Sequence, residues 1–358
     1  MLATGFEFFK QKMKLKISAF LSFMMLLSGG YAQDIKIKNI VFEGAGMRGL
    51  AYGGVVSSLE QHGIIDDIEK VGGTSAGAII ALLISLDYNS EELTSIIYNT
   101  KFRKFNDGKF IFIGGISRTM KRYGWYRGEK FSEWLGNLIE EKTGNPEITF
   151  EQLHERGYKD LYLTATCLNR QQLVILSRKT YPNMKIKDAV RVSMSVPLYY
   201  QAVFVDSAGN IFSKPADGKK LDVMVDGGII GNFPIQIFDR VINDSLSQQV
   251  RIPNYETLGV RIDSDLQIQQ DSTSRKLAEY PIEDFQDYIQ AFYVMVIENL
   301  NRQHLTKMDW DRTISISSVG VGPKVKKLSK DQKERLISSG IQSTDKYLKT
   351  YQKRLTEK

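Results

Sequence analysis

Hydrophobic and polar residues alternate from residue 34 and give way to a fully apolar run that ends at residue 42, as in a strand that enters a core. A glycine-rich turn follows, and residues 50–62 have the spacing of a helix. Residues 68–72 form a second short strand pattern, and another glycine-rich turn leads into an apolar helix over residues 78–86. Strand, turn and helix occur twice within about 50 residues, which predicts an α/β fold with parallel strands.

The rest of the chain continues this mixture of strands and helices. Residues 91–150 are expected to be mainly helical, with aromatic and glycine interruptions. Further strands are predicted at residues 160–168, 173–177, 221–225 and 258–262, and further helices at residues 186–194 and 281–304. Two basic helices are expected between residues 326 and 355. No internal repeat, low-complexity tract or linker stands out, so we expect one domain.

Composition and charge exclude several classes of protein. The chain has 358 residues, of which 42% are hydrophobic and 25% charged, as in folded proteins. A single cysteine, Cys167, excludes an intramolecular disulfide, and with three histidines it makes a zinc cluster implausible. We expect neither metal nor other cofactor. Of the net charge of +7, residues 1–32 hold +3 and the chain from Val321 holds +7, so the body carries −3. We therefore expect no nucleic-acid partner.

The amino terminus has the pattern of a secretory signal. Lys14 and Lys16 precede an apolar run over residues 17–27, and small residues follow at Gly30 and Ala32. We predict a signal peptide over residues 1–32, cleaved near Ala32 and Gln33, with Met13 as a possible start. The apolar run is short for a membrane span, so the mature protein is expected to be periplasmic or secreted and not integral to a membrane. An amphipathic or buried first helix is the alternative.

The first motif with chemical meaning is G-x-S-x-G, formed by Gly73, Ser75 and Gly77. It lies between a predicted strand and a predicted helix, which is the context of a nucleophile elbow. Glycines flank the serine because the sharp turn leaves no room for side chains. The same pattern also fits a tight turn with a capping serine, so the motif alone does not decide.

A second glycine motif follows the first strand, with Gly44, Gly46 and Gly49 in the spacing G-x-G-x-x-G. A dinucleotide site would require an acidic residue at the end of the second strand, and that strand ends instead at Ser75. Two adjacent parallel strands would bring both turns to the same sheet edge. We therefore favour an oxyanion hole, formed by backbone N–H groups of this loop: Gly44, Ala45, Gly46, Met47, Arg48 and Gly49.

A nucleophilic serine needs a base. His62 and His154 are expected at surface positions. His304 follows Ser75 and Asp226 in the chain order of α/β-hydrolase triads, but its polar surroundings resemble a solvated helix face. Asp226 is the better candidate because it directly follows a core strand, and Gly227 and Gly228 let the backbone approach closely.

Together these motifs resemble the patatin-like phospholipase family. The blocks 44–49, 73–77 and 226–228 occur in the family's order, and residues 193–197 (Ser-Met-Ser-Val-Pro) resemble a fourth block. The resemblance spans about residues 36–262. Ala45 stands where the family usually has glycine, and Phe233 where a second asparagine is common.

The resemblance implies a three-layer α/β/α fold with a mainly parallel sheet, with a catalytic domain over residues 36–262. Residues 263–358 would form a mainly helical extension packed on it. It also implies that Ser75 is the nucleophile, Asp226 the base without a histidine, and residues 44–49 the oxyanion loop. The substrates implied are phospholipid or acylglycerol esters, cleaved through an acyl-enzyme. Arg48 would hold the loop by pairing with a carboxylate or would bind lipid phosphate.

Two other functions remain open: a His304-dependent esterase of the ordinary α/β-hydrolase type, and a non-catalytic surface protein that binds through a hydrolase fold. The basic carboxyl terminus adds a further hypothesis. Its apolar residues recur at helical spacing (Ile341, Leu348, Tyr351 and Leu355), and its basic residues occupy other faces (Lys346, Lys349, Lys353 and Arg354). This segment either only docks on the domain or also attracts an anionic membrane.

Overall fold

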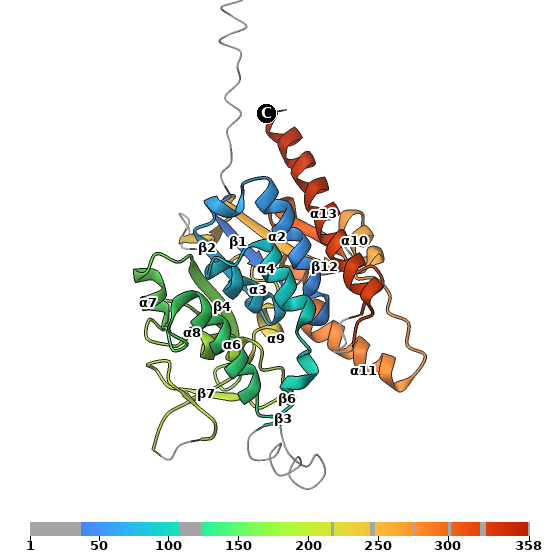
Figure 1. The fold of residues 1–358 in the computed structure, drawn as a ribbon. Coiled ribbons are helices and arrows are strands. Elements are labelled where there is room, and N and C mark those ends of the chain that lie inside the picture. The colour runs from blue at the N-terminus through green and yellow to red at the C-terminus, as the bar shows by residue number, and fades with distance from the viewer. Residues whose placement is uncertain are drawn as a thin grey trace, which may run out of the picture. The chain divides into compact units, whose positions relative to one another are not determined.

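The computed structural model describes residues 37–107, 123–215, 218–243, 248–274, 276–299, 302–322 and 327–356. It divides into one unit over Lys36–Leu348 and another that joins Met1–Ile35 to Lys349–Lys358. The predicted signal peptide, residues 1–32, lies outside the described residues. The fold and the candidate site described below belong to the Lys36–Leu348 unit (Figure 1).

A nine-stranded sheet organises this unit, in the order β13-β12-β1-β2-β4-β9-β7-β8, with β5 also paired to β4. The strands are β1 (Asn39–Phe42), β2 (Lys70–Gly73), β4 (Asp160–Cys167), β5 (Gln172–Leu176), β7 (Val203–Val205), β8 (Ile211–Phe212), β9 (Asp222–Asp226), β12 (Thr257–Asp263) and β13 (Thr313–Ser317). The pairs from β13 to β4 are parallel, and those of β5, β7, β8 and β9 are antiparallel. The predicted mainly parallel α/β sheet is confirmed: β13, β12, β1, β2 and β4 form a parallel half, to which the antiparallel strands are added on the β4 side.

Both faces of the parallel half are covered, which explains why β1 is apolar after its first residue, Asn39. Ile40 and Phe42 join the main apolar core on one face, whereas Val41 packs with Phe233 and Ile235 on the other. The helices that contribute to the main core are α2 (Ala51–Gln61), α3 (Ala76–Ser85), α4 (Ser90–Asn99), α6 (Glu129–Thr143), α7 (Phe150–Glu155), α8 (Ile186–Ser193) and α13 (Lys330–Thr356). On the other side the short helix α9 (Gly228–Gly231) contacts β4 and the π-helix η4 (Val294–Asn299).

Smaller elements complete the described chain. Two two-stranded sheets pair β3 (Gly124–Tyr126) with β6 (Leu198–Tyr200) and β10 (Arg240–Asn243) with β11 (Gln249–Ile252). The 3-10 turns are η1 (Gly46–Leu50), η2 (Ile65–Asp67), η3 (Phe102–Phe105) and η5 (Arg302–His304).

The chain after residue 262 differs from the expectation in three ways. It contains α10 (Asp265–Ser272), α11 (Phe285–Tyr293), α12 (Lys307–Asp311) and α13 (Lys330–Thr356). Its strand β13, which the sequence pattern does not predict, extends the main sheet beside β12, while most of the segment is helical. The helix expected over residues 281–304 is divided into α11, η4 and η5.

The third difference is that α13 is one helix, where two were expected. Gly340 lies inside it and serves packing: a Cβ there would lie 2.1 Å from the carbonyl oxygen of Ala51 on α2. Gly54 on α2 is equally close to α13, since its Cβ would lie 2.0 Å from the carbonyl oxygen of Ile337. The glycine allows two helices to cross closely and does not end α13.

Candidate active site

Ser75 occupies the turn between β2 and α3 with φ 53° and ψ −121°, a conformation that is strained for a residue with a side chain. Hydrogen bonds of Thr74 fix the turn. Its hydroxyl lies 2.6 Å from Thr164 Oγ1 and donates to Gly231 O at 3.0 Å. Gly77 must be glycine because a Cβ would lie 2.4 Å from Phe42 O, at the end of β1. The predicted strand–turn–helix context of Ser75 is therefore present, with the serine half-buried.

The loop from Gly44 to Gly49 lies against this turn. A Cβ on Gly44 would lie 3.2 Å from Ser75 Cβ. Asn232 fixes the loop twice: Gly44 N donates to Asn232 O at 3.1 Å, and Asn232 Nδ2 donates to Gly44 O at 3.0 Å. Arg48 is buried, and its backbone N and its Nε both donate to Ala45 O, at 3.1 and 3.2 Å. The position of Arg48 supports a structural role in the loop.

A network of buried charged side chains begins at Glu43, the residue before the loop. Glu43 Oε2 accepts a hydrogen bond from Ile262 N at 3.2 Å, and Glu43 pairs with Arg261 at 3.2 Å. Asp263 bridges Arg261, at 2.8 Å, and Arg302 of η5. Burial alone would raise the pKa of Asp263, but the nearby guanidinium groups, including that of Arg48, lower it. Asp263 therefore stays ionised and joins η5 to β12, while Arg261 joins β12 to Glu43, the residue between β1 and the loop.

Asp226 ends β9, on the other side of β4 from Ser75. Gly73, two residues before Ser75, pairs with Leu163 of β4, and Asp226 pairs with Ala165 of the same strand. The serine and the aspartate therefore reach the same sheet edge from strands of opposite direction. Sequence analysis placed Asp226 at a strand end and did not foresee that this strand is antiparallel.

The Asp226 carboxyl is buried, and its Oδ1 accepts a hydrogen bond from Gly228 N at 2.8 Å. Among the described residues, Oδ2 has no hydrogen-bond partner. Burial raises the pKa of Asp226 to about 6, although the Gly228 N–H and the nearby Ser75 hydroxyl each offset part of the rise. Gly227 is needed beside it because a Cβ would lie 2.1 Å from Thr164 Oγ1.

The block 193–197 contacts both residues. Ser75 N donates to Ser193 Oγ at 3.1 Å, and Ser75 Oγ donates to Met194 Sδ at 3.6 Å. Asp226 N donates to Ser195 O at 2.9 Å. The sequence indicates this block only through the family resemblance, and it indicates no role for Asn232. No pattern within either segment indicates these roles, because every partner lies in another segment, from 31 residues away for Ser195 and Asp226 to 188 for Asn232 and Gly44.

The histidines lie elsewhere. His62 Nδ1 lies 2.8 Å from Ser58 O, and His154 Nδ1 lies 2.8 Å from Asp160 at the start of β4. His304 is exposed on η5. Within the described part of the chain, no hydrogen bond joins a histidine to Ser75 or Asp226.

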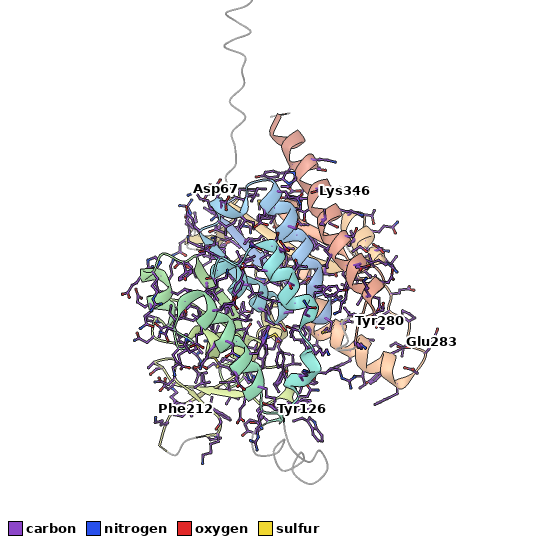
Figure 2. All side chains as sticks on the ribbon, viewed as in Figure 1. Asp67, Tyr126, Phe212, Tyr280, Glu283 and Lys346 are labelled. Atoms are coloured by element: carbon purple, nitrogen blue, oxygen red, sulfur yellow. The ribbon has the colours of Figure 1, made fainter. Side chains whose placement is uncertain are left out.

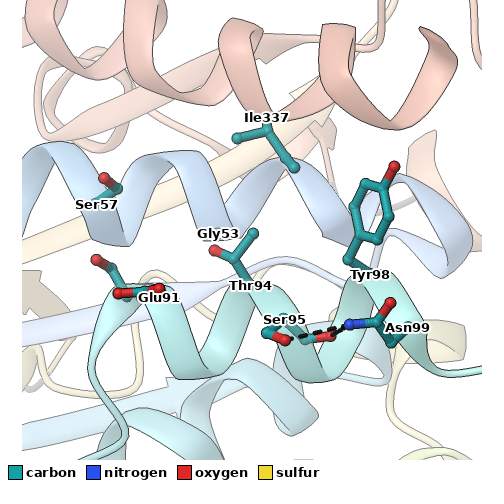
Figure 3. A pocket seen from close by; sticks show the side chains of 9 residues that line it. Gly53, Ser57, Glu91, Thr94, Ser95, Tyr98, Asn99 and Ile337 are labelled. Carbon is teal, nitrogen blue, oxygen red and sulfur yellow. Dashed lines mark hydrogen bonds between the residues drawn. The ribbon is translucent and has the colours of Figure 1, made fainter. Parts of the chain in front are cut away.

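A groove of about 510 Å³ lies between α2, α4 and α13, away from Ser75 (Figure 3). Its lining includes Ser57, Glu91, Thr94, Tyr98 and Ile337. The residues described contain no group of three or more His, Cys, Asp or Glu side chains able to hold a metal ion. Nor does the described part of the chain include a helix long and apolar enough to cross a membrane.

Comparison with known proteins identifies the family to which this chain belongs. The family model for patatin-like phospholipases matches residues 40–239. An uncharacterized protein of Acanthamoeba polyphaga mimivirus, R571, is 26% identical over 87% of this chain and 93% of its own length. A probable lipid hydrolase of Invertebrate iridescent virus 6, 463L, is 25% identical over 56% of this chain and 62% of its own. The crystal structure of VipD from Legionella pneumophila shares the fold, with a TM-score of 0.57, 14% identity, and coverage of 88% of this chain and 67% of VipD.

The fold is thus an α/β fold with a mostly parallel central sheet flanked by helices, as in patatin-like proteins. Within that class, the chain belongs to the patatin-like phospholipase family. It is a lipid ester hydrolase.

Proposed function

We propose that the protein cleaves acyl esters of lipids through Ser75 and Asp226, without a histidine. The single observation that carries the proposal is that Ser75, in a strained turn, and the buried Asp226 reach one sheet edge on either side of β4. Ser75 Oγ attacks the ester carbonyl carbon while Asp226 accepts the hydroxyl proton. Asp226 then gives this proton to the leaving alkoxide, and an acyl-enzyme remains. Water, deprotonated by Asp226, hydrolyses the acyl-enzyme and restores Ser75.

The raised pKa of Asp226 supports its role as base. An ordinary aspartate, with a pKa of about 3.9, is a weak base, and a value of about 6 increases its affinity for the serine proton. At neutral pH such a carboxyl is still mainly ionised. Asp226 Oδ2 is buried and has no hydrogen-bond partner among the described residues, so it is available for the proton.

The loop at residues 44–49 supplies the oxyanion hole in this proposal. Gly44 N and Arg48 N already donate to Asn232 O and Ala45 O. The amides between them, in particular those of Gly46 and Met47, are the candidates to hold the developing oxyanion. Gly46 has φ 53°, which turns the backbone at this point. Ala45, where the family usually has glycine, is buried and does not prevent backbone donation.

Phospholipids and acylglycerols are the proposed substrates. Both present an acyl ester carbonyl, and the family's description and the lipid hydrolase relative point to lipids. The finer choice between head groups depends on contacts that a substrate would make.

A fluorophosphonate probe tests the assignment directly. The parent protein should be labelled at Ser75, and Ser75→Ala should lose both labelling and lipid hydrolysis. Ser57→Ala, in the separate groove, is the matched control and should behave like the parent protein. Labelling of Ser75→Ala would overturn the nucleophile. Failure of the folded parent to be labelled or to hydrolyse any lipid would favour a binding protein.

The base is tested in the same assay. Asp226→Asn should lose activity, and His304→Gln should keep most of it. An active Asp226→Asn together with an inactive His304→Gln would favour the histidine-dependent esterase.

We also propose that the protein is exported, on the strength of the signal pattern over residues 1–32. Expression in a Gram-negative host followed by amino-terminal sequencing should give a mature protein that starts near Gln33. A soluble cytoplasmic protein that keeps Met1 or Met13 would contradict export.

A further inference from the structure

α11 presents a row of large apolar side chains to solvent. Phe285 is 76% exposed and Phe292 is 64% exposed. Tyr288, Ile289 and Met295 are also exposed and, with these two, recur every three or four residues, which places all five on one side of the helical stretch. A row of apolar side chains on a helix usually packs onto the protein core. A row that is exposed instead is typical of a surface that binds a partner protein or a lipid.

The opposite side of the same stretch reaches the candidate active site. Ile297, in η4, is buried, and its Cγ2 lies 3.0 Å from the position of a Cβ on Gly228. Gly228 N donates to Asp226 Oδ1. The exposed apolar face therefore belongs to the segment that packs against the glycine bonded to the proposed base.

A second apolar group belongs to the β3–β6 pair and the residue before it, and consists of Tyr123, Trp125 and Leu198, all exposed. Leu198 is 66% exposed, has φ 67°, and follows by four residues Met194, which contacts Ser75. Figure 1 shows β3, β6 and α11 toward the lower side of the view. In Figure 2, Tyr126 of β3 lies at this lower side, whereas Asp67, before β2, and Lys346, on α13, lie at the upper side.

Charge indicates what kind of surface these groups meet. Between Lys276 and Arg302 the sequence holds no lysine or arginine, but it holds five acidic residues: Glu279, Glu283, Asp284, Asp287 and Glu298. This segment repels an anionic membrane, whereas the sequence on either side of β3 is basic (Lys121, Arg122, Arg127 and Lys130). A zwitterionic or neutral lipid surface is the one that neither group repels. Phenylalanine and tyrosine are suited to the boundary between lipid and water.

We propose that the exposed side chains of α11–η4 (Phe285, Tyr288, Ile289, Phe292 and Met295) and of β3–β6 (Tyr123, Trp125 and Leu198) form an apolar rim that inserts into a zwitterionic or neutral lipid surface. The rim holds the side of the molecule that carries the half-buried Ser75 against the lipid, so that an ester reaches Ser75 without crossing water. This inference rests on the proposed lipid hydrolysis and adds the surface that presents the substrate.

The test measures binding in a Ser75→Ala background, where vesicles are not consumed and binding does not depend on hydrolysis. Flotation with phosphatidylcholine vesicles at physiological salt should show the Ser75→Ala protein bound. Adding Phe285→Ser and Phe292→Ser should weaken binding by roughly tenfold or more, because two large apolar groups no longer leave water. The matched control adds Val241→Ser and Ile242→Ser on β10, which are 61% and 47% exposed and lie outside the rim, and it should bind like its parent.

Other outcomes would overturn the rim. Vesicle binding equal to the parent's in the α11 variant would do so, provided circular dichroism shows that the variant is folded. Binding that requires anionic lipid would assign membrane contact to another part of the chain. Sedimentation that shows a dimer of the parent and a monomer of the α11 variant would mean that a second copy covers this face. The two proposals can fail separately. If the rim variants lose vesicle binding but the parent protein, with Ser75 intact, hydrolyses no lipid, the rim is supported and only the proposed function is contradicted.

Discussion

Asn232 binds Gly44 through both its backbone and its side chain, across 188 residues of sequence. The asparagine follows α9, directly after the aspartate block, and the glycine begins the loop that lies against Ser75. One residue thus joins the segment with the proposed base to the segment with the proposed oxyanion donors. Its Oδ1 also lies 2.3 Å from where a Cβ on Gly44 would be, so a larger residue at position 44 would clash with it.

Removing this side chain should weaken catalysis without unfolding the protein. Asn232→Ala keeps the backbone bond to Gly44 N and loses the bond to Gly44 O, so the loop can drift from the oxyanion. A displacement of about 1 Å in a catalytic group can lower the rate by about 100-fold. We therefore expect kcat to fall by roughly 10- to 100-fold, with KM little changed. Steady-state kinetics on a soluble ester measures this. Asn210→Ala, in an exposed turn, is the control, and an Asn232→Ala kcat within about twofold of the parent's would contradict the positioning role.

The pH dependence of hydrolysis should report the ionisation of Asp226. Burial raises its pKa to about 6, and the base acts only when ionised. We therefore expect kcat/KM to be level above about pH 7 and to fall about tenfold for each unit below about pH 6. Rates of ester hydrolysis from pH 4.5 to 8.5 on folded protein measure the profile. A rate that stays level down to about pH 4.5 would contradict a base with this environment.

The burial of Asp226 also predicts how stability depends on pH. A salt-bridged aspartate stabilises the fold when it ionises, whereas the ionised Asp226 should destabilise it. Because the native pKa exceeds the unfolded one, the native state holds the extra proton between about pH 4 and 6, and stability falls as pH rises through this window. Asp226→Asn removes the buried charge and keeps the oxygen that accepts from Gly228 N. We expect its free energy of unfolding at about pH 8 to exceed the parent's by up to about 3 kcal/mol. The gain should disappear at about pH 4.

Urea denaturation at both pH values measures the difference. Asp206→Asn is the contrasting control, since hydrogen bonds, chiefly from Asn210, lower the pKa of this exposed carboxyl. It should not stabilise the protein at about pH 8. An Asp226→Asn variant that is less stable than the parent at both pH values would show that the ionised carboxylate does not destabilise the native state.

The elements that place Ser75 and Asp226 could be predicted from sequence because each depends on local pattern. The apolar runs that become β1, β2 and β9 and the glycines beside Ser75 and Asp226 are all visible within short windows. The family resemblance through these blocks is confirmed by the match over residues 40–239. Their roles in catalysis stay predictions.

What could not be predicted depends on contacts between distant segments. Asn232 and Met194 act on partners that only the folded sheet brings near. Gly340 resembles a helix break until α2 is packed against it. Phe233, where the family often has asparagine, joins the small core beside Val41 and lies near the Arg261 guanidinium. Strand β13 is short and half polar, and its pairing with β12 is what makes it a strand.

The network of buried charged side chains that begins at Glu43 should matter more than charges at the surface. Asp263→Ala would leave the guanidinium groups of Arg261 and Arg302 buried without this carboxylate. We expect a loss of about 3–5 kcal/mol in the free energy of unfolding, measured by urea denaturation at neutral pH. Lys307→Ala, which removes an exposed pair with Asp311, should cost at most about 1 kcal/mol. Equal losses in the two variants would contradict this ranking.

The basic carboxyl terminus provides a test of membrane attraction that is separate from the apolar rim. The segment from Val321 carries +7, and each basic residue near an anionic surface contributes about 1 kcal/mol, which salt screens. Replacing Lys346, Lys349, Lys353 and Arg354 by Glu should weaken binding of the Ser75→Ala protein to phosphatidylserine-containing vesicles, most at low salt. Binding to pure phosphatidylcholine should change little, because no attraction between opposite charges is lost there. Unchanged binding to anionic vesicles at low salt would leave this segment with a packing role alone, and parallel losses on both vesicle types would indicate that the reversal had disturbed the fold.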